Sequence, residues 1–273
     1  MNRYSVLMSV YIKEQPQYLK QSIDSMLNQT VFPDEIVIVK DGPLTEQLDS
    51  VLDGYASAYP SLFKIITNEQ QLGLGMSLST GLNHCKNELV ARMDTDDISL
   101  PERCEKQLKE FQKNKEISLI GGTISEFIDI ETNIIGRRIV PTRDNEIKAY
   151  LKKRCPFNHV SVMFKKNEVI KAGSYCDWYC NEDYYLWIRM YEYGSKFANL
   201  AETLVYVRVG PDMYKRRGGK RYYKSEKELQ KYMYKKKIIS YKQYLWNSWI
   251  RFIFQVLVPN SIRGYLFKKL ARS

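Results

Sequence analysis

The chain has 273 residues, of which 44% are hydrophobic and 27% are charged. A chain of this length and apolar content can bury a full core, which excludes a disordered protein. The N-terminal residues enter a strand-like pattern directly, without a charged and then apolar leader, so we expect a cytoplasmic protein. Five cysteines at irregular spacing predict reduced, structural thiols and exclude a disulfide framework.

The net charge of +11 is concentrated near the C-terminus. Residues 204–273 contain 18 Lys and Arg against 3 Asp and Glu, a balance of +15. This leaves 24 of the 42 basic residues and 28 of the 31 acidic residues in the preceding part, a balance of −4. Such asymmetry predicts that the C-terminal part meets an anionic partner, which can be a nucleic acid, a lipid headgroup or a phosphorylated substrate.

Strands and helices alternate over residues 1–115. The hydrophobic pattern predicts strands at 4–11, 34–42, 62–68 and 88–94. It predicts helices at 16–29, 44–58, 75–85 and 101–114. This alternation predicts an α/β fold with a doubly wound, mostly parallel sheet, in which ligands bind beyond the carboxyl ends of the strands.

The pattern loosens after residue 115. We expect strands at 117–129, 159–166 and 204–210, and a helix with an aromatic face at 182–194. We therefore expect one α/β domain over residues 1–210, whose pattern changes between residues 1–115 and residues 116–210. Residues 211–273 form a basic, aromatic tail for which we expect helices.

Three carboxylates crowd the end of the predicted strand at 88–94, in "ELVARMDTDDISLPER". Asp94, Asp96 and Asp97 stand so close together that they must raise one another's pKa unless a cation or water compensates them. An Asp-x-Asp pair at a strand end can hold Mg²⁺ or Mn²⁺, whose remaining positions are filled by phosphate oxygens and water. This arrangement suits a nucleoside diphosphate.

A simpler interpretation of the cluster is helix capping. Asp97 or Ser99 would then cap the helix expected to begin near Pro101, since Asp and Ser are good cap residues. Asp41 also follows a predicted strand, so it should lie on the same sheet edge as the carboxylate cluster and could share one ligand with it.

Four stretches follow one another in the chain: "SVY" at 9–11, "IVIVKDG" at 36–42, "LGLGMSLSTGLNHCKNELVARMDTDDISLPERCEKQ" at 72–107 and "NEDYYLWIRM" at 181–190. Together they resemble the family 2 glycosyltransferases of the GT-A fold, of the bacterial polysaccharide-biosynthesis type. The resemblance implies a catalytic domain over residues 1–210, with a Rossmann-like nucleotide-sugar-binding half (1–115) and an acceptor half (116–210). It also implies an inverting, metal-dependent enzyme that uses a nucleoside-diphosphate sugar, with a UDP-sugar favoured.

The resemblance implies roles at the ends of the first two strands. Ser9 and Tyr11 would lie along the base and ribose, and Asp41 would accept a hydrogen bond from the base. Most relatives carry two consecutive acids where this chain has Lys40 and Asp41, so no role is expected for position 40.

The resemblance also assigns the residues around the carboxylate cluster. Arg92 would lie beside the nucleotide, although it can equally be an ion-pair partner of the cluster. Asp94 would approach the ribose or a metal-bound water, Asp96 would bind Mn²⁺ or Mg²⁺, and Thr95 between them belongs to the nucleotide-sugar site.

The catalytic base implied by the resemblance is Asp183, with Glu182 beside it. A sugar hydroxyl has a pKa far above 7, so a carboxylate within hydrogen-bond reach must take its proton during transfer. A base opposite the departing diphosphate gives inversion. The alternative for both carboxylates is compensation of the helix dipole at an N-terminus.

Four further residues complete the expected site. His159 and Trp187 are assigned to the acceptor side, although a lone histidine is as often structural. Arg216 and Arg217 in the loop "RVGPDMYKRRGG" could clamp the diphosphate, because guanidinium groups match phosphate geometry.

The sequence does not decide between two environments for the tail. Its longest apolar stretch, "FIFQVLV", is far shorter than the roughly 20 residues that span a bilayer, but its basic and aromatic residues suit the inner membrane surface. The acceptor would then be a polyprenyl-diphosphate-linked sugar in capsule, exopolysaccharide or O-antigen assembly. Alternatively the tail packs on the catalytic domain. A nucleic-acid-binding or scaffold protein is the competing function, and it leaves the carboxylates without a role.

Overall fold

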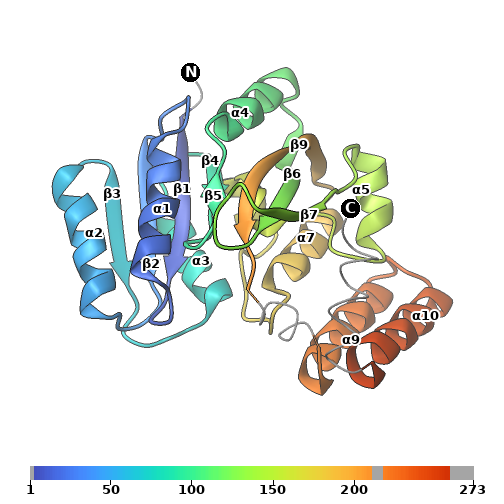
Figure 1. The fold of residues 1–273 in the computed structure, drawn as a ribbon. Helices are drawn as coiled ribbons and strands as arrows, with labels where there is room; N and C mark the ends of the chain where they lie inside the picture. Colours follow the sequence, from blue (N-terminus) through green and yellow to red (C-terminus); the bar gives the residue numbers. More distant parts are fainter. Residues whose placement is uncertain (1–2, 211–217, 259–273) are drawn as a thin grey trace.

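A mixed sheet covered by helices on both faces forms the centre of the molecule in the computed structural model, which describes residues 3–210 and 218–258 (Figure 1). The strand order is β3-β2-β1-β4-β8-β6-β9-β5, and β7 pairs with β6. The strands are β1 (Tyr4–Val10), β2 (Glu35–Lys40), β3 (Phe63–Thr67), β4 (Leu89–Arg92), β5 (Ile98–Ser99), β6 (Ile117–Phe127), β7 (Ile134–Arg138), β8 (Met163–Lys165) and β9 (Lys196–Arg208). The helices are α1 (Pro16–Leu27), α2 (Glu46–Ala58), α3 (Leu74–His84), α4 (Arg103–Lys113), α5 (Asp144–Leu151), α6 (Lys166–Lys171), α7 (Glu182–Glu192), α9 (Lys220–Lys235) and α10 (Tyr241–Phe252), with short turns η1 (His159–Ser161) and η2 (Ile253–Leu257).

The first half of the sheet is parallel, as the sequence predicts. Strand β1 pairs in parallel with β2 and β4, and β2 pairs in parallel with β3. The carboxyl ends of these strands therefore meet at one edge. The second half combines one parallel pair, β6 with β9, with antiparallel pairs that join β4 to β8 and β5 to β9.

The apolar runs of the first strands are explained by burial on both faces. On β1, Val6 and Met8 point into the core shared with α1 and α2, whereas Leu7 points into the core shared with α3 and α7. All three side chains are fully buried. Strands buried on both faces are apolar along their whole length rather than alternating, which confirms the doubly wound α/β prediction.

Residues 116–210 depart from the predicted elements. The strand expected at 204–210 is the end of the longer β9, and the stretch expected at 159–166 contains η1 and only three residues of strand β8. The sequence pattern missed β5, β7, α5 and α6, which are short. They contain 2, 5, 8 and 6 residues, which is too short for a hydrophobic period to mark them in the sequence.

The described part of the tail packs on the catalytic domain as a helical hairpin. Leu229 and Met233 of α9 are fully buried in the same core as the side chains of α7. Arg216, Arg217 and residues 259–273 lie outside the described residues. None of the helices in the described ranges is long and apolar enough to cross a bilayer.

Helices α3 and α7 approach each other closely at Gly75. We predict that Gly75→Ala destabilises the fold, because the added Cβ would lie 2.4 Å from the carbonyl oxygen of Cys176 and 3.1 Å from the Cβ of Glu182. Urea unfolding should show a loss of about 1–3 kcal/mol. In the control variant Gly54→Ala, on α2, the added Cβ meets nothing within 4 Å, and stability should rise by roughly 0.5–1 kcal/mol. Equal stability of the two variants would contradict this packing.

Candidate active site

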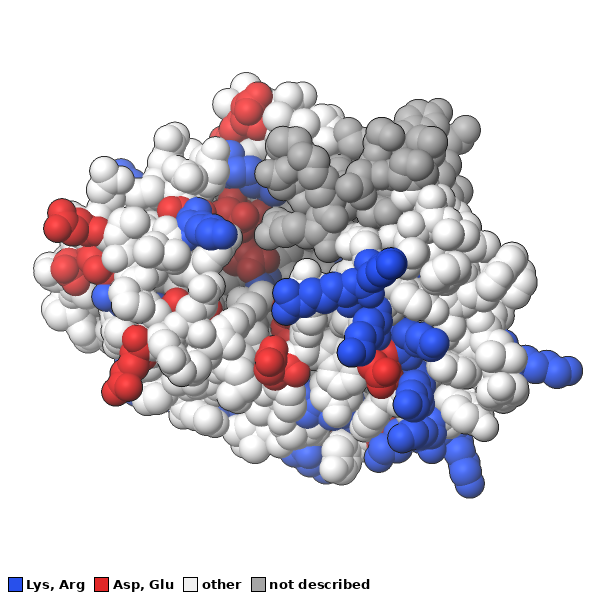
Figure 2. Space-filling model, turned by 90° about the horizontal axis from the view of Figure 1, so that it is seen from below, with Lys and Arg blue, Asp and Glu red and all other residues white. Residues whose placement is uncertain are grey.

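The three crowded carboxylates lie directly after β4, on the carboxyl edge of the parallel strands. Oxygen atoms of Asp94, Asp96 and Asp97 all lie within 4.8 Å of one another. Figure 2 views this edge and shows acidic side chains in a hollow near the middle of the face. Three oxygen donors at this spacing form a set that suits a hard divalent cation.

A buried cation compensates the cluster from within the protein. Arg92 is 1% exposed, and both of its terminal nitrogens donate hydrogen bonds to the two carboxylate oxygens of Asp94. Burial lowers the pKa of Arg92, but the adjacent Asp94 outweighs burial and the net pKa is raised. The interpretation of Arg92 as an ion-pair partner of the cluster is therefore confirmed. Both carboxylate oxygens of Asp94 already accept hydrogen bonds from Arg92.

The neighbouring Arg103 is a second buried cation, and the sequence analysis gave it no role. It is 1% exposed, and its Nη2 donates to the carbonyl oxygens of Arg92 and Val162. Burial lowers its pKa. Arg103 thus ties the end of β4 to the segment before β8 and fixes the position from which the carboxylate cluster projects.

Asp97 and Asp96 have different surroundings. Asp97 is 3% exposed and its Oδ1 accepts a hydrogen bond from the backbone N–H of Arg208 at 2.8 Å. The helix-capping interpretation is wrong, because α4 begins with Glu102 as its N-cap and neither Asp97 nor Ser99 caps it. Within residues 3–210 and 218–258, Asp96 has no ion-pair partner within 4.0 Å. Burial, then Asp94 and Glu14, raise the pKa of Asp96 to about 7.

Glu14, in the loop after β1, is a fourth acidic residue that the sequence analysis missed. Its Oε2 accepts a hydrogen bond from the Thr95 hydroxyl at 2.7 Å, and burial raises its pKa. Thr95 itself is 4% exposed, so its hydrogen bond to Glu14 fixes the Asp-rich loop from the buried side. A carboxylate directly after the first strand must lie on the carboxyl edge, and this position was the signal that could have identified Glu14.

Arg208, at the end of β9, holds the Asp-rich loop from the other side. Its Nε donates to the carbonyl oxygen of Asp96 at 3.1 Å, and its guanidinium lies over the rings of Tyr18 and Phe127, at 3.9 and 4.6 Å from their centroids. The loop is thereby joined to α1 and β6. The loop "RVGPDMYKRRGG" begins at this arginine, but the sequence analysis gave Arg208 no role.

The predicted nucleotide residues lie at the ends of β1 and β2. Ser9 and Tyr11 are half-buried beside the cluster, and their roles remain predictions. The Asp41 carboxylate accepts hydrogen bonds from the Leu72 and Gly73 amides and from the Ser77 hydroxyl, at 2.7 to 3.3 Å. Asp41 therefore fixes the N-terminus of α3, and base recognition would be an additional role.

The predicted base lies in the first turn of α7. Burial raises the pKa of Asp183, and the Cys155 thiol donates to its Oδ2 at 3.6 Å. Burial, followed by the adjacent Asp183, raises the pKa of Glu182 to about 7. Arg92 lowers the pKa of both carboxyl groups. The pair on α7 and the cluster after β4 therefore face the same buried guanidinium.

Arg138 shapes the loop on which Cys155 lies. Its Nη2 and Nη1 donate to the carbonyl oxygens of Cys155 and Phe157, at 2.7 and 3.0 Å. Arg138 also lowers the pKa of Asp183. Neither Arg138 nor Cys155 belongs to a motif visible in the sequence.

Aromatic side chains form the floor beneath the site, and here one prediction is corrected. Trp187 is fully buried against Phe157, His159 and Tyr175, so it cannot line an acceptor pocket. The Nε2 of His159 hydrogen-bonds to the Tyr175 hydroxyl at 3.0 Å, and burial holds the pKa of His159 well below its usual range. An acceptor role for the half-buried His159 stays a prediction.

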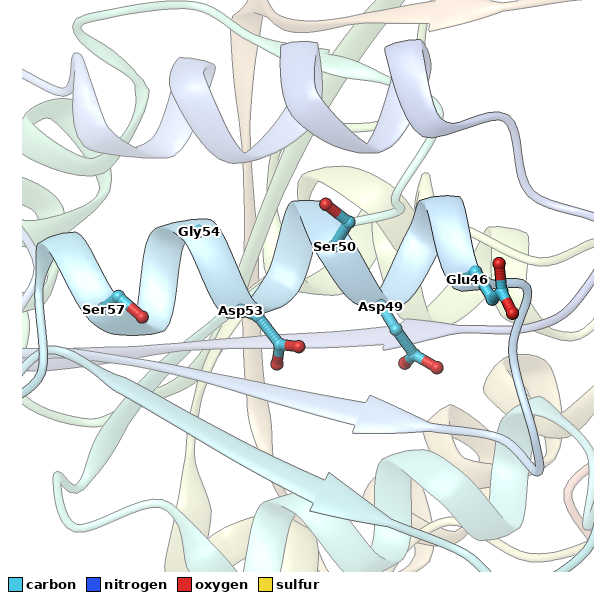
Figure 3. A pocket seen from close by; sticks show the side chains of 6 residues that line it. All are labelled: Glu46, Asp49, Ser50, Asp53, Gly54 and Ser57. Atoms are coloured by element: carbon cyan, nitrogen blue, oxygen red, sulfur yellow. The ribbon is translucent and has the colours of Figure 1, made fainter.

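A separate hollow lies on the outer face of α2, away from these residues (Figure 3). It is a shallow groove lined by Glu46, Asp49, Ser50, Asp53, Gly54 and Ser57. All six residues come from one helix, and no residue of the Asp-rich loop or α7 contributes to it. The groove is therefore no part of the candidate active site.

Residues 5–175 match the family described as "Glycosyl transferase family 2". The chain belongs to this family. A protein of Escherichia coli, UDP-Gal:alpha-D-GlcNAc-diphosphoundecaprenol beta-1,3-galactosyltransferase, is 40% identical over 273 residues, which cover 99% of this chain and 97% of that protein. The amylovoran biosynthesis glycosyltransferase AmsE of Erwinia amylovora is 43% identical over 83% of this chain and 84% of its own length.

A solved structure supports the fold assignment. The mannosyltransferase PcManGT from Pyrobaculum calidifontis, in complex with GDP-Man and Mn²⁺, superimposes with a TM-score of 0.63 at 14% identity, covering 99% of this chain and 76% of that one. Similarity at this level shows the fold alone. This family 2 chain is thus a glycosyltransferase with a GT-A-like fold, and a function confined to nucleic-acid binding is not supported.

The raised pKa of Glu182 predicts that stability depends on pH. The carboxyl titrates near 4.5 in the unfolded chain and near 7 in the fold, so the stability that its proton contributes is lost as the pH rises between these values. Glu182→Gln removes this titration. At pH 8 it should raise the free energy of unfolding by roughly 1–2 kcal/mol, less than the full shift because the side chain is partly solvated.

Urea unfolding at pH 5 and pH 8 measures the effect. The gain should be smaller at pH 5, where the native carboxyl is already protonated. Glu116→Gln, at an exposed position before β6, is the matched control and should behave alike at both pH values. A gain in Glu182→Gln that is equal at both pH values would contradict the assigned burial.

Proposed function

We propose that this protein is an inverting glycosyltransferase that moves a sugar from a UDP-sugar to a lipid-linked saccharide acceptor. The observation that carries the proposal is the arrangement around Arg92. The charge of Arg92 lowers the pKa of Asp96, which has no ion-pair partner among the described residues, and also the pKa of Glu182 and Asp183. Donor and base chemistry need these two groups of carboxylates to face one another.

The Asp-rich loop is suited to a divalent metal. Its donors are carboxylate oxygens within 4.8 Å of one another, which Mg²⁺ and Mn²⁺ prefer. Asp96 would hold the ion directly, while Asp94, already bonded to Arg92, would act through a water or the ribose. When bound, the ion would offset negative charge on the leaving diphosphate.

The α7 pair would supply the base. As the acceptor oxygen bonds to the anomeric carbon, the bond from that carbon to the diphosphate breaks and the hydroxyl proton passes to Asp183. A carboxylate with a raised pKa is a better proton acceptor near neutral pH. The thiol of Cys155 donates to Asp183, and the guanidinium of Arg138 holds the loop that carries Cys155. The products are the glycoside and the nucleoside diphosphate.

The names of two relatives support a proposal for the acceptor and the cellular setting. The related galactosyltransferase of Escherichia coli is named for a diphosphoundecaprenol-linked GlcNAc acceptor, and AmsE is named for amylovoran biosynthesis. We propose that this chain likewise uses a polyprenyl-diphosphate-linked saccharide in capsule, exopolysaccharide or O-antigen assembly. It would work in the cytoplasm, at the inner face of the membrane where such an acceptor is embedded.

Asp96→Asn should separate donor binding from the rest of the site. In isothermal titration with UDP-galactose and Mn²⁺, affinity should fall at least about tenfold because a metal ligand is lost. Asp53→Asn on the outer face of α2 is the matched control and should bind like the unmodified protein (Figure 3). Donor binding unchanged by Asp96→Asn, or independent of added metal, would rule out the assigned metal site.

Asp183→Asn should keep donor binding and lose transfer. A missing general base typically lowers the turnover rate about 10²–10⁴-fold, which a radiolabelled UDP-galactose assay with a GlcNAc-diphospho-lipid acceptor would measure. Glu182→Gln should lose less activity, since it is the neighbour and not the base. If Asp183→Asn turns over normally while Glu182→Gln is inactive, the two roles must be exchanged.

A further inference from the structure

Helix α10 turns its apolar face toward solvent. Leu245, Trp246, Trp249 and Phe252 are 48%, 59%, 56% and 38% exposed. Trp249 stands four residues after Leu245 and three after Trp246, and Phe252 follows three residues later, so the four share one side of the helix. An amphipathic helix on a globular domain normally buries this side, which makes the orientation of α10 unusual.

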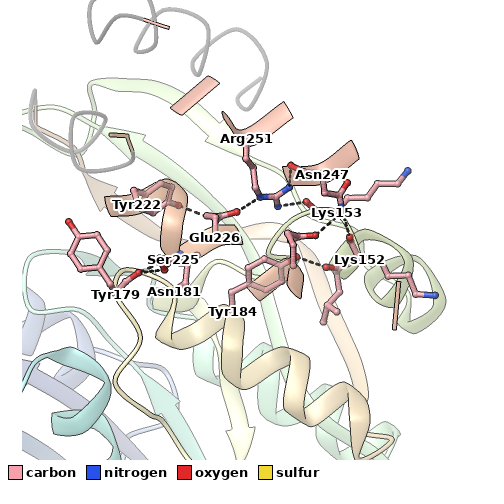
Figure 4. A network of polar contacts seen from close by, with 12 residues as sticks. Lys152, Lys153, Tyr179, Asn181, Tyr184, Tyr222, Ser225, Glu226, Asn247 and Arg251 are labelled. Atoms are coloured by element: carbon pink, nitrogen blue, oxygen red, sulfur yellow. Dashed lines mark hydrogen bonds and ion pairs between the residues drawn. The ribbon is translucent and has the colours of Figure 1, made fainter. Parts of the chain in front are cut away.

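Polar contacts hold α10 in this orientation (Figure 4). The Asn247 amide is 8% exposed and donates to the carbonyl oxygen of Lys152 at 2.9 Å. Arg251 pairs with Glu226 of α9 and donates through Nη2 to the carbonyl oxygen of Lys153 at 2.7 Å. Rotating the helix to bury its tryptophans would break the Arg251–Glu226 pair and leave buried charge unpaired. The outward apolar face is therefore fixed by the fold.

The surface around this face is strongly basic. Residues 220–258 contain 10 Lys and Arg against 2 Asp and Glu, a balance of +8, and one of the two acids is the paired Glu226. Lys242 stands one helical turn before Trp246, on the exposed side of α10. Figure 2 shows basic side chains gathered on the part of the molecule where α9 and α10 lie.

We propose that the outward face of α10, with the lysines of α9 beside it, seats on an anionic lipid surface. Trp and Phe favour the boundary between headgroups and acyl chains, and each nearby lysine is attracted to anionic headgroups. The rings of Trp246 and Trp249 lie side by side, with centroids 5.5 Å apart, and form the centre of the contact.

Two other occupants fit the surface less well. A second copy of the chain would bring two surfaces of charge +8 together, and like charges across an interface are strongly unfavourable. A nucleic acid would match the lysines but would leave Leu245 and Phe252 in water. Only a lipid surface satisfies the apolar face and the positive charge together.

Lipid seating would also position the catalytic helix. Leu229 and Met233 of α9 pack in the same core as α7, which carries Asp183. An α9–α10 hairpin resting on a bilayer therefore holds α7 at a fixed height above it. This consequence rests on the proposed function, because it matters only if the acceptor is embedded in that bilayer. The lipid contact itself does not depend on it.

Vesicle flotation of the full chain tests the proposal. The protein should float with vesicles of phosphatidylcholine and phosphatidylglycerol, less with phosphatidylcholine alone, and less at high salt. Trp246→Ser/Trp249→Ser should weaken binding to the anionic vesicles at least about tenfold. The matched control is Phe32→Ser/Ile170→Ser, which removes side chains that are 54% and 43% exposed elsewhere, and it should float like the unmodified chain.

Three results would overturn the proposal. The first is equal flotation of Trp246→Ser/Trp249→Ser and the control. The second is a lipid-free dimer, seen by sedimentation velocity, that only the tryptophan variant disperses, because the face would then join two copies. The third is DNA binding that the variant loses while vesicle binding persists.

Sugar transfer to a water-soluble, short-chain acceptor separates this inference from the proposed function. The tryptophan variant should transfer at the unmodified rate, since neither residue touches the catalytic groups. Lost flotation with normal transfer supports the lipid contact. Absence of transfer in every variant and in the unmodified chain would count against the proposed function alone.

Discussion

The burial of Arg92 is the constraint on which the site depends. A fully buried guanidinium requires a carboxylate partner, and Asp94 provides it with both oxygens. The same cation lowers the pKa of Asp96 on the loop and of Glu182 and Asp183 on α7. One positive charge thus offsets two groups of acids, one after the buried strand β4 and one in the first turn of α7.

Crowding gives the carboxylates properties that an isolated acid lacks. Burial and mutual repulsion raise the pKa of Asp96 and Glu182 to about 7, so both groups exchange protons near neutral pH. A divalent cation would reverse this effect at Asp96, because a bound ion is the largest local charge and favours the ionised carboxylate. Without a ligand, the carboxylates of the site repel one another. A bound cation or a proton donor would relieve this repulsion.

The sequence predicts the parallel half of the fold well, and the physical reason is burial on both faces. Strands such as β1 and β2 become continuous apolar runs, and the acids at their ends stand out. Asp96 and Asp183 could be selected because they belong to long motifs. Glu14 could have been found from its place after the first strand, whereas Arg208 contributes through contacts with residues far away in the sequence, which no local pattern records.

One error of sequence reasoning has a clear cause. Trp187 was assigned to the acceptor pocket but lies in the floor beneath it. The sequence left the environment of the tail open, and the structure turns the apolar side of α10 outward. Periodicity identifies the faces of a helix but not which face meets the core. That choice depends on contacts such as Arg251 with Glu226, which join separate elements.

The most direct test of the account is a crystal structure with UDP and Mn²⁺, recorded at a wavelength where manganese scatters anomalously. The account predicts an anomalous peak within coordination distance of an Asp96 oxygen, about 2.2 Å, with the diphosphate on the side of the ion that faces α7. A peak elsewhere, or UDP bound in full without one at Asp96, would contradict the assignment of the carboxylate cluster as the donor site.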